Sequence, residues 1–132
     1  MREILFKAKG QTDDKWHIGF LANLYGGICI IRENEHEWIC KPETICQYTG
    51  IKDKNGKLIF ENDVVKATVR QNSLCQSSSY SDFYQISYQE KYCYFYLKKK
   101  NNNLLFDGNW SYYIKSIEVI GNIFDNPELI NE

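Results

Sequence analysis

The residues best suited to recognition chemistry are three tyrosines at alternating positions, followed by a run of three lysines. They are Tyr92, Tyr94, Tyr96, Lys98, Lys99 and Lys100. Side chains at alternating positions of a strand point to one face, so the three phenol rings would lie in a row. Aromatic rings beside cations can stack nucleobases and hold phosphates. Tyrosine is also enriched at protein interfaces, and rings of this kind can simply cover a sheet, so three interpretations stay open.

The patterns of common catalytic sites are absent from the sequence. Neither G-x-x-x-x-G-K-[ST] nor G-x-G-x-x-G occurs, and the residue four positions after His36 is Cys40, so no H-E-x-x-H zinc motif forms. Only two histidines are available as bases near neutral pH. A nucleophilic pair of Cys40 and His17 is conceivable, but the spacing does not favour it over packing. We therefore expect a protein that is not an enzyme and binds no cofactor.

The cysteines read as buried thiols. Their number is odd and no C-x-x-C pair occurs among Cys29, Cys40, Cys46, Cys75 and Cys93. Structural zinc sites use closely spaced ligand pairs, which this spacing lacks. Free cysteine packs as a small apolar side chain. The sequence thus predicts no disulfide and no metal site.

Composition predicts a globular protein of one domain over 1–132. The chain has 132 residues, 43% of them hydrophobic and 15% aromatic, which is enough apolar surface for a real core. The net charge of −1 disfavours indiscriminate nucleic-acid binding, which needs a basic excess. No apolar stretch at the start is long enough for a signal peptide, so we expect a cytoplasmic protein without a membrane partner.

The elements that would position these residues are short strands. Period-two patterns and β-branched runs predict strands over 2–9, 16–24, 28–32, 64–69, 83–88, 91–97, 104–106, 110–114 and 117–124, and apolar residues return to the core over 38–40. Gly26-Gly27 and Asn55-Gly56 predict tight turns. The pattern indicates a mainly β fold of about nine or ten short, mostly antiparallel strands. It does not choose between a barrel, a sandwich and a coiled sheet.

Three further segments have their own predicted structure. Pro42 at a first helical position predicts one helical turn over 42–44. Residues 71–82 hold several serines and few large apolar groups, which predicts a mobile loop. Asn126 as a cap, followed by Pro127, predicts a short C-terminal helical turn.

Three blocks of sequence resemble the YopX family of phage and prophage proteins. They read REILFKAK over 2–9, PETICQYTGIKDKNGKLIFENDVV over 42–65 and IEVIGNIFDNPELI over 117–130. Together they span about a third of the chain, whereas residues 71–116 match no pattern. Family members usually have glycine at the position of Asn62 and often at that of Ala8. The resemblance implies a β-rich fold and a phage or prophage origin, and it carries over no catalytic residues.

Fold-defining roles account for most of the middle block, because Asn55-Gly56 fixes a turn and Val64 begins a strand. Its polar or amphipathic residues near turns are the functional alternatives. They are Tyr48, Thr49 and Asp53.

These observations together predict a small phage or prophage accessory protein that binds a host or defence protein, for example as an anti-CRISPR or other anti-defence factor. Dimers or larger homo-oligomers would be natural for a tyrosine-rich β surface. The first alternative is a nucleic-acid-binding module that uses the tyrosines and the lysine turn. The second is a binder or hydrolase of a small nucleotide signal.

Overall fold

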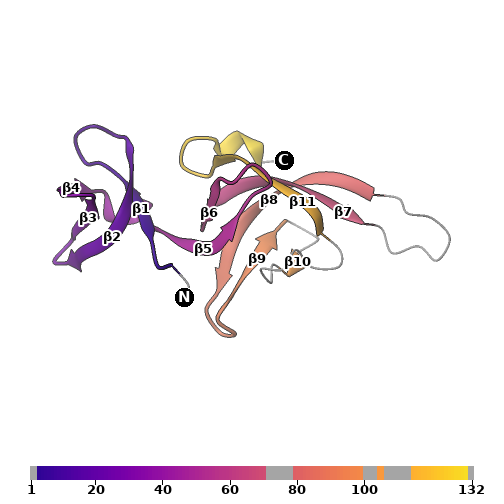
Figure 1. Cartoon of the computed structure of the whole chain (residues 1–132), viewed down its shortest axis with the longest axis horizontal. Helices are drawn as coiled ribbons and strands as arrows, with labels where there is room; N and C mark the ends of the chain where they lie inside the picture. The colour runs from indigo at the N-terminus through magenta and orange to yellow at the C-terminus, as the bar shows by residue number, and fades with distance from the viewer. Residues whose placement is uncertain (1–2, 71–78, 100–103, 106–113, 131–132) are drawn as a thin grey trace. The chain divides into compact units, whose positions relative to one another are not determined.

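The fold is mainly β, as the sequence predicts. The structure is a computed structural model that describes residues 3–70, 79–99, 104–105 and 114–130. These residues form eleven strands, paired antiparallel, and two isolated 3-10 turns (Figure 1). The chain divides into two compact units, 1–50 and 51–132. The expectation of a single domain over 1–132 stays a prediction.

The N-terminal unit is built from strands that follow one another along the chain. They are β1 (Phe6–Lys9), β2 (Trp16–Tyr25), β3 (Ile28–Glu33), β4 (His36–Cys40), the turn η1 (Pro42–Thr44) and the start of β5 (Cys46–Lys52). The strand order is β4-β3-β2-β1-β5. Gly26 and Gly27 close the β2–β3 hairpin with φ angles of 66° and 76°. Because glycine has no Cβ, it reaches this region without steric cost, and the predicted turn is confirmed.

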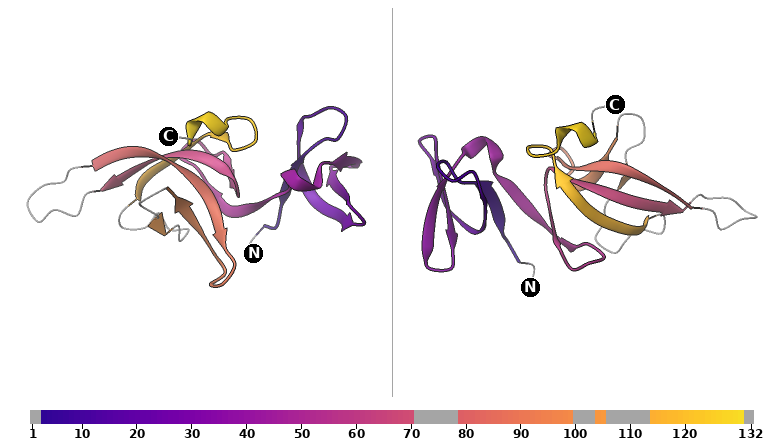
Figure 2. Two further views of the ribbon diagram at one scale, coloured as in Figure 1. Left: turned by 180° about the vertical axis from the view of Figure 1, so that it is seen from behind. Right: turned by 90° about the horizontal axis from the view of Figure 1, so that it is seen from above.

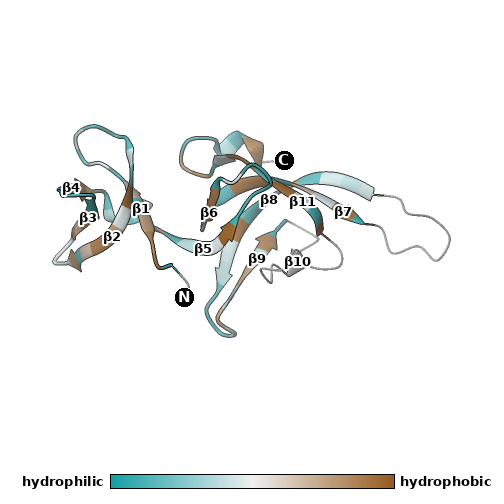
Figure 3. Ribbon diagram, in the orientation of Figure 1, coloured by the Kyte–Doolittle hydropathy of each residue, from teal (hydrophilic) through white to brown (hydrophobic). Residues whose placement is uncertain are grey.

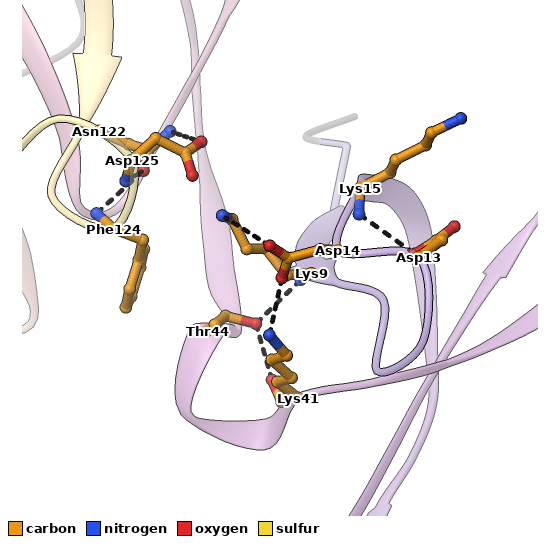
Figure 4. A network of polar contacts seen from close by, with 9 residues as sticks. All are labelled: Lys9, Asp13, Asp14, Lys15, Lys41, Thr44, Asn122, Phe124 and Asp125. Carbon is orange, nitrogen blue, oxygen red and sulfur yellow. Dashed lines mark hydrogen bonds and ion pairs between the residues drawn. The ribbon is translucent and has the colours of Figure 1, made fainter.

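Backbone bonds join the first and fourth strands of this unit. Gly10 forms a bridge to Cys40, and Lys41 N donates to Lys9 O at 2.8 Å. The Thr44 hydroxyl accepts from Lys9 N at 2.9 Å and donates to Lys41 O at 2.7 Å (Figure 4). The predicted helical turn over 42–44 therefore exists and places Thr44 where it secures this junction.

The core of the N-terminal unit is small. Its fully buried members are Ala8, Cys29, Ile31 and Cys40, with Phe6, Leu21 and Ile45 packed against them. Apolar and polar residues mix along its strands (Figure 3), and the period-two alternation sends one set inward. Cys29 and Cys40 occupy paired positions of β3 and β4 as free, buried thiols.

The C-terminal unit is organised around one five-stranded sheet. Its elements are the end of β5, then β6 (Leu58–Phe60), β7 (Asp63–Arg70), β8 (Ser79–Gln89), β9 (Tyr94–Lys98), β10 (Leu104–Leu105), β11 (Ile114–Asn122) and η2 (Pro127–Leu129). The sheet has the order β10-β9-β8-β7-β11, and β6 lies beside β5. Figure 2 shows β7, β8 and β11 as long, curved strands.

One face of this sheet, together with Ile59 of β6, forms the larger core. Its buried members are Ile59, Val65, Ala67, Val69, Tyr84, Ile86, Leu97, Ile114 and Ile117. Burial raises the pKa of Tyr84 to about 12, with a further contribution from Tyr80, so Tyr84 stays protonated and neutral inside the core.

The predicted loop over 71–82 is wrong in its last four residues. Ser79–Asp82 belong to β8, because Ser79 pairs with Arg70 and the hydroxyls of Ser81 and Thr68 lie 2.9 Å apart. Serines on the solvent-facing side of a strand give that segment a composition that is typical of a loop. Residues 71–78 lie outside the described residues, as do 106 and 110–113 of two predicted strands.

The C-terminal helical turn is confirmed as η2. Asn126 occupies the cap position, but its side chain makes no capping bond. The Asn126 Oδ1 atom instead accepts a hydrogen bond from Asn122 N at 3.3 Å. The Asn122 side chain accepts from Phe124 N and Asp125 N (Figure 4). Within the described ranges, no helix has the length and apolar character required to cross a membrane.

Candidate binding face

The three tyrosines lie in contact along the β8–β9 hairpin. The rings of Tyr92 and Tyr94 have centroids 6.2 Å apart and planes 17° apart, and those of Tyr94 and Tyr96 are 6.2 Å apart at 70°. Tyr94 and Tyr96 lie on β9. Tyr92 lies in the connecting turn rather than in the predicted strand over 91–97, since Cys93 has a φ of 56° that ends the extended backbone.

The alternation of β9 turns the tyrosines away from the core. Phe95 and Leu97 pack into the C-terminal core, so Tyr94 and Tyr96 must point to the other side. Tyr92 keeps 64% of its surface exposed and Tyr94 keeps 36%. Tyr96 is half-buried, so the rings form a solvent-facing row that is most exposed at Tyr92.

Neutral polar residues of β8 lie opposite this row. Gln89 pairs with Tyr94, Ser87 with Tyr96, and Gln85 with Lys98. We call the following set the tyrosine face: Tyr92, Tyr94, Tyr96, Gln85, Ser87 and Gln89. The amides and the hydroxyl on β8 are functional candidates that sequence reasoning missed. The alternation over 83–89 places them on one side of a strand, but only the register of the hairpin brings them opposite the tyrosines.

The structure separates the lysines of the predicted cationic run. Lys98 is exposed on the same side as Tyr94 and Tyr96. Lys99, one residue on, points to the opposite side, where its ammonium forms an ion pair with Asp82 and lies 5.9 Å from the centre of the Tyr84 ring. Lys100 lies outside the described residues. One described lysine of the run is thus placed to serve the tyrosine face.

A second cluster surrounds His17 in the N-terminal unit. Its Nε2 atom lies 2.9 Å from Asp13 Oδ2 and its Nδ1 atom lies 3.5 Å from Glu33 Oε1, while its ring stacks on Trp38 at 4.2 Å. The Lys15 amide and then His17 hold the pKa of Asp13 below its ordinary value, outweighing the opposing effect of desolvation. Asp13 lies four residues before His17, but Glu33 and Trp38 come from later strands, so no short motif marks this cluster.

This cluster does not form the nucleophilic pair considered from the sequence. Both ring nitrogens of His17 face carboxylates, and the Cys40 thiol donates to Trp38 O at 3.5 Å. Burial raises the pKa of Cys40 to about 11, so its reactive thiolate form is scarce near neutral pH. Among the described residues, no three His, Cys, Asp or Glu side chains lie together in a way that could hold a metal ion.

The functional candidates within the middle block are buried, and their contacts are with the protein's own fold. Asp53 accepts hydrogen bonds from the backbone amides of Asn55, Lys57 and Val119 at 2.8–2.9 Å. Tyr48 and Thr49 are buried on β5. The tyrosine face is therefore the best candidate for recognition among the residues that the sequence singled out.

A family model described as YopX protein matches residues 6–131, nearly the whole chain. The chain belongs to the YopX family. The match confirms the resemblance carried by three short blocks, and it extends across residues 71–116, where the sequence showed no recognisable pattern.

A solved structure supports the same fold. The crystal structure of protein EF1440 from Enterococcus faecalis aligns with a TM-score of 0.57 over 99% of this chain and 100% of that chain, at 23% sequence identity. At that identity the likeness concerns the fold alone. No curated protein matches the chain.

Proposed function

We propose that this YopX-family chain is a non-enzymatic binding module whose tyrosine face docks on another protein. A host or defence protein in the cytoplasm of a phage-carrying bacterium is the partner class we favour, and anti-CRISPR or other anti-defence activity is its concrete form. The observation that carries the proposal is the solvent-facing row of Tyr92, Tyr94 and Tyr96 on one hairpin. Tyrosine supplies a large contact area with little loss of side-chain entropy on binding.

The chemistry around the rings favours a protein partner over a nucleic acid. The residues paired with the outer side of β9 are Gln85, Ser87 and Gln89, which are neutral and hydrogen-bond in both directions. Tyrosine with small and amide-bearing polar residues is the composition of protein-binding loops. Affinity for a nucleic acid would instead come from several cations that neutralise phosphates. Lys98 lies beside the rings, whereas Lys99 is engaged by Asp82.

A matched pair of variants tests the proposal. Tyr94→Ser alters the tyrosine face, and Tyr88→Ser alters the opposite side of the same hairpin at nearly equal exposure, 36% against 37%. Each protein is used as bait in lysate of a bacterial host, and captured proteins are quantified by mass spectrometry. We expect proteins retained by the wild type and by Tyr88→Ser to be depleted at least about tenfold with Tyr94→Ser. Equal capture by all three baits would count against the proposal.

Two direct assays address the alternatives. Fluorescent single-stranded DNA and RNA would bind with an affinity that falls steeply with salt, and less tightly to Lys98→Ala, if the nucleic-acid interpretation holds. A screen of nucleotides by thermal shift would raise the melting temperature if a small nucleotide signal is the ligand. We expect neither response from a protein-binding module.

A further inference from the structure

Exposed apolar side chains are concentrated in the N-terminal unit. Of the twelve large apolar residues that the described part of the chain leaves exposed, eight lie in this smaller unit. They are Ile4, Ile18, Phe20, Leu24, Tyr25, Ile28, Trp38 and Ile39. A unit of about 50 residues buries a modest share of its surface and is marginal alone. Apolar groups left outside such a small core call for a second surface to cover them.

Several of these residues share one face of the β2–β3–β4 sheet. Cys29 and Ile31 point inward to the core, so Ile28, Ile30 and Arg32 point outward on β3. The register then places further side chains on the outward side, across from those three. Tyr25 faces Ile28, Phe20 faces Arg32, Ile39 faces Ile30 and Glu37 faces Arg32. The three strands lie side by side (Figures 1 and 3).

We call this set the outer face: Phe20, Tyr25, Ile28, Ile30, Arg32, Glu37 and Ile39. Its apolar area is in the range of the largest patch on a typical monomer, and such a patch is often functional. Phe20 is 65% exposed and Tyr25 is 85% exposed, so at roughly 200 Å² per aromatic side chain the two leave about 300 Å² open. Ile28 and Ile39 add to this at 49% and 56% exposure. A stable interface covers roughly 800 Å² on each partner, around an apolar centre of this kind.

The charges of the outer face indicate which kind of partner covers it. Arg32 and Glu37 form an ion pair at 2.6 Å, so the face has one cation and one anion and no net charge. An anionic membrane or a nucleic acid would select a basic face, which this is not. A two-fold axis that runs along the strands between β3 and β4 would set Arg32 of one copy opposite Glu37 of the other, so the face can be complementary to itself in that arrangement. The low net charge of the chain, −1, leaves little repulsion between copies.

We infer that the outer face is a self-association surface, on which two copies of this chain pack with their β2–β3–β4 sheets together. Phe20, Ile30 and Ile39 form the apolar centre of this interface, and the Arg32–Glu37 pairs lie beside it. The inference does not depend on the proposed function, because it concerns a different unit and none of the residues of the tyrosine face.

Sedimentation velocity over a concentration series tests this inference with two matched substitutions. Ile39 and Ile4 are both isoleucines of the N-terminal unit, 56% and 55% exposed, but only Ile39 lies on the outer face. We expect the full-length wild type and Ile4→Lys to dimerise with similar affinity. Ile39→Lys places an unpaired ammonium within the apolar centre, so it should weaken dimerisation at least about thirtyfold. Circular dichroism melts show whether each variant is folded.

A charge exchange gives a second readout that misfolding does not mimic. Arg32→Glu sets like charges together within and between copies and should weaken dimerisation. Combining it with Glu37→Arg restores opposite charges and should restore dimerisation. A wild type that stays monomeric at high micromolar concentration would overturn the inference. Equal loss with Ile4→Lys and Ile39→Lys, or wild-type affinity in Ile39→Lys, would overturn it as well.

Discussion

The Asp53 carboxylate is buried yet ionised because three backbone amides donate to it. Oδ1 accepts from Asn55 N at 2.8 Å and Lys57 N at 2.9 Å, and Oδ2 accepts from Val119 N at 2.9 Å. Burial alone would raise the pKa of Asp53, but the amides, led by Val119, outweigh it and hold the pKa below its ordinary 3.8. The side chain thus links the turn after β5 to β11.

Replacing this carboxylate should destabilise the protein in a pH-dependent way. In Asp53→Asn an amide group would face a backbone amide, so we expect a loss of about 1–3 kcal/mol at neutral pH. Since the pKa is lower in the folded protein, the carboxylate stabilises fully above its unfolded pKa, and this stabilisation is lost as pH falls through the folded value. Urea unfolding at a series of pH values measures both effects.

The control for this experiment is Glu35→Gln, which removes an exposed carboxylate. Its curve of stability against pH should follow that of the wild type within about 0.5 kcal/mol. An Asp53→Asn variant as stable as the wild type at pH 7 would show that the three amide bonds contribute little.

The cysteines should differ strongly in reactivity. Cys93 is exposed, whereas burial raises the pKa of Cys40 to about 11, so at pH 8 roughly one Cys40 thiol in a thousand is ionised even before access is considered. We expect iodoacetamide to modify Cys93 at least about a hundredfold faster than Cys40. Peptide mapping by mass spectrometry follows each site, and denatured protein, in which both should react alike, is the control. Comparable rates in the folded protein would contradict the buried position of Cys40.

At the scale of elements, Asn62 shapes the corner between β6 and β7. Its φ of 70° lies in the left-handed region, its amide donates to Ile86 O at 2.8 Å, and its carbonyl accepts from Ile123 N at 3.0 Å. Glycine reaches this φ freely, whereas a β-branched residue does so at a cost.

Two substitutions at this corner should therefore change the free energy of unfolding by clearly different amounts. We expect Asn62→Gly to change the free energy of unfolding by less than about 1 kcal/mol, because easier backbone geometry offsets the lost side chain. Asn62→Val should lose about 2 kcal/mol or more. Thermal and urea unfolding measure both, and equal stability of the two variants would show that the backbone angle does not matter here.

Elements with a local cause could be predicted from sequence. Gly26-Gly27 and Asn55-Gly56 encode their turns, and Pro42 and Pro127 begin their helical turns, because each effect lies within a few residues. Ser79–Asp82 and Tyr92 were misassigned for a different reason. The first segment is a strand because β7 pairs with it, and Tyr92 leaves the strand because of the turn around Cys93. Neither cause is visible in composition.

The same distinction, between features with a local cause and features that depend on strand pairing, applies to the candidate site. The common face of Tyr94 and Tyr96 follows from their spacing, but their polar neighbours depend on hairpin register, and so does the pairing of Lys99 with Asp82. Register depends on how the turns and apolar faces of the whole sheet fit together, which a short stretch of sequence does not reveal.

At the scale of the molecule, each unit has its own apolar core. Ile31 is fully buried in the N-terminal core, whereas Ile28 lies exposed on the same strand. We expect Ile31→Ala to cost about 2–5 kcal/mol and Ile28→Ala less than about 1 kcal/mol. Because the cores are separate, hydrogen exchange in Ile31→Ala should accelerate over 16–33 much more than over 79–98.

The same exchange measurement addresses the number of domains. Acceleration confined to the N-terminal unit would identify two units that open separately. Equal acceleration in both segments would indicate one cooperative domain over 1–132, as chain length alone predicts. Chain length could not reveal the division into two units. The division depends on which strands pair, and β5 pairs with β1 although three strands separate them in the sequence.

The path of strand β5 affects where the genes of related proteins could recombine without disrupting the fold. It pairs with β1 through Cys46 and Gln47, and it continues past Gly50 to Lys52 beside β6. A crossover at residue 50 would therefore cut a strand that pairs with β1 at its start and lies beside β6. Chimeras of this protein with relatives should tolerate joints in the connections outside 46–60 better than a joint at the midpoint of that strand, so natural recombination would inherit this segment intact.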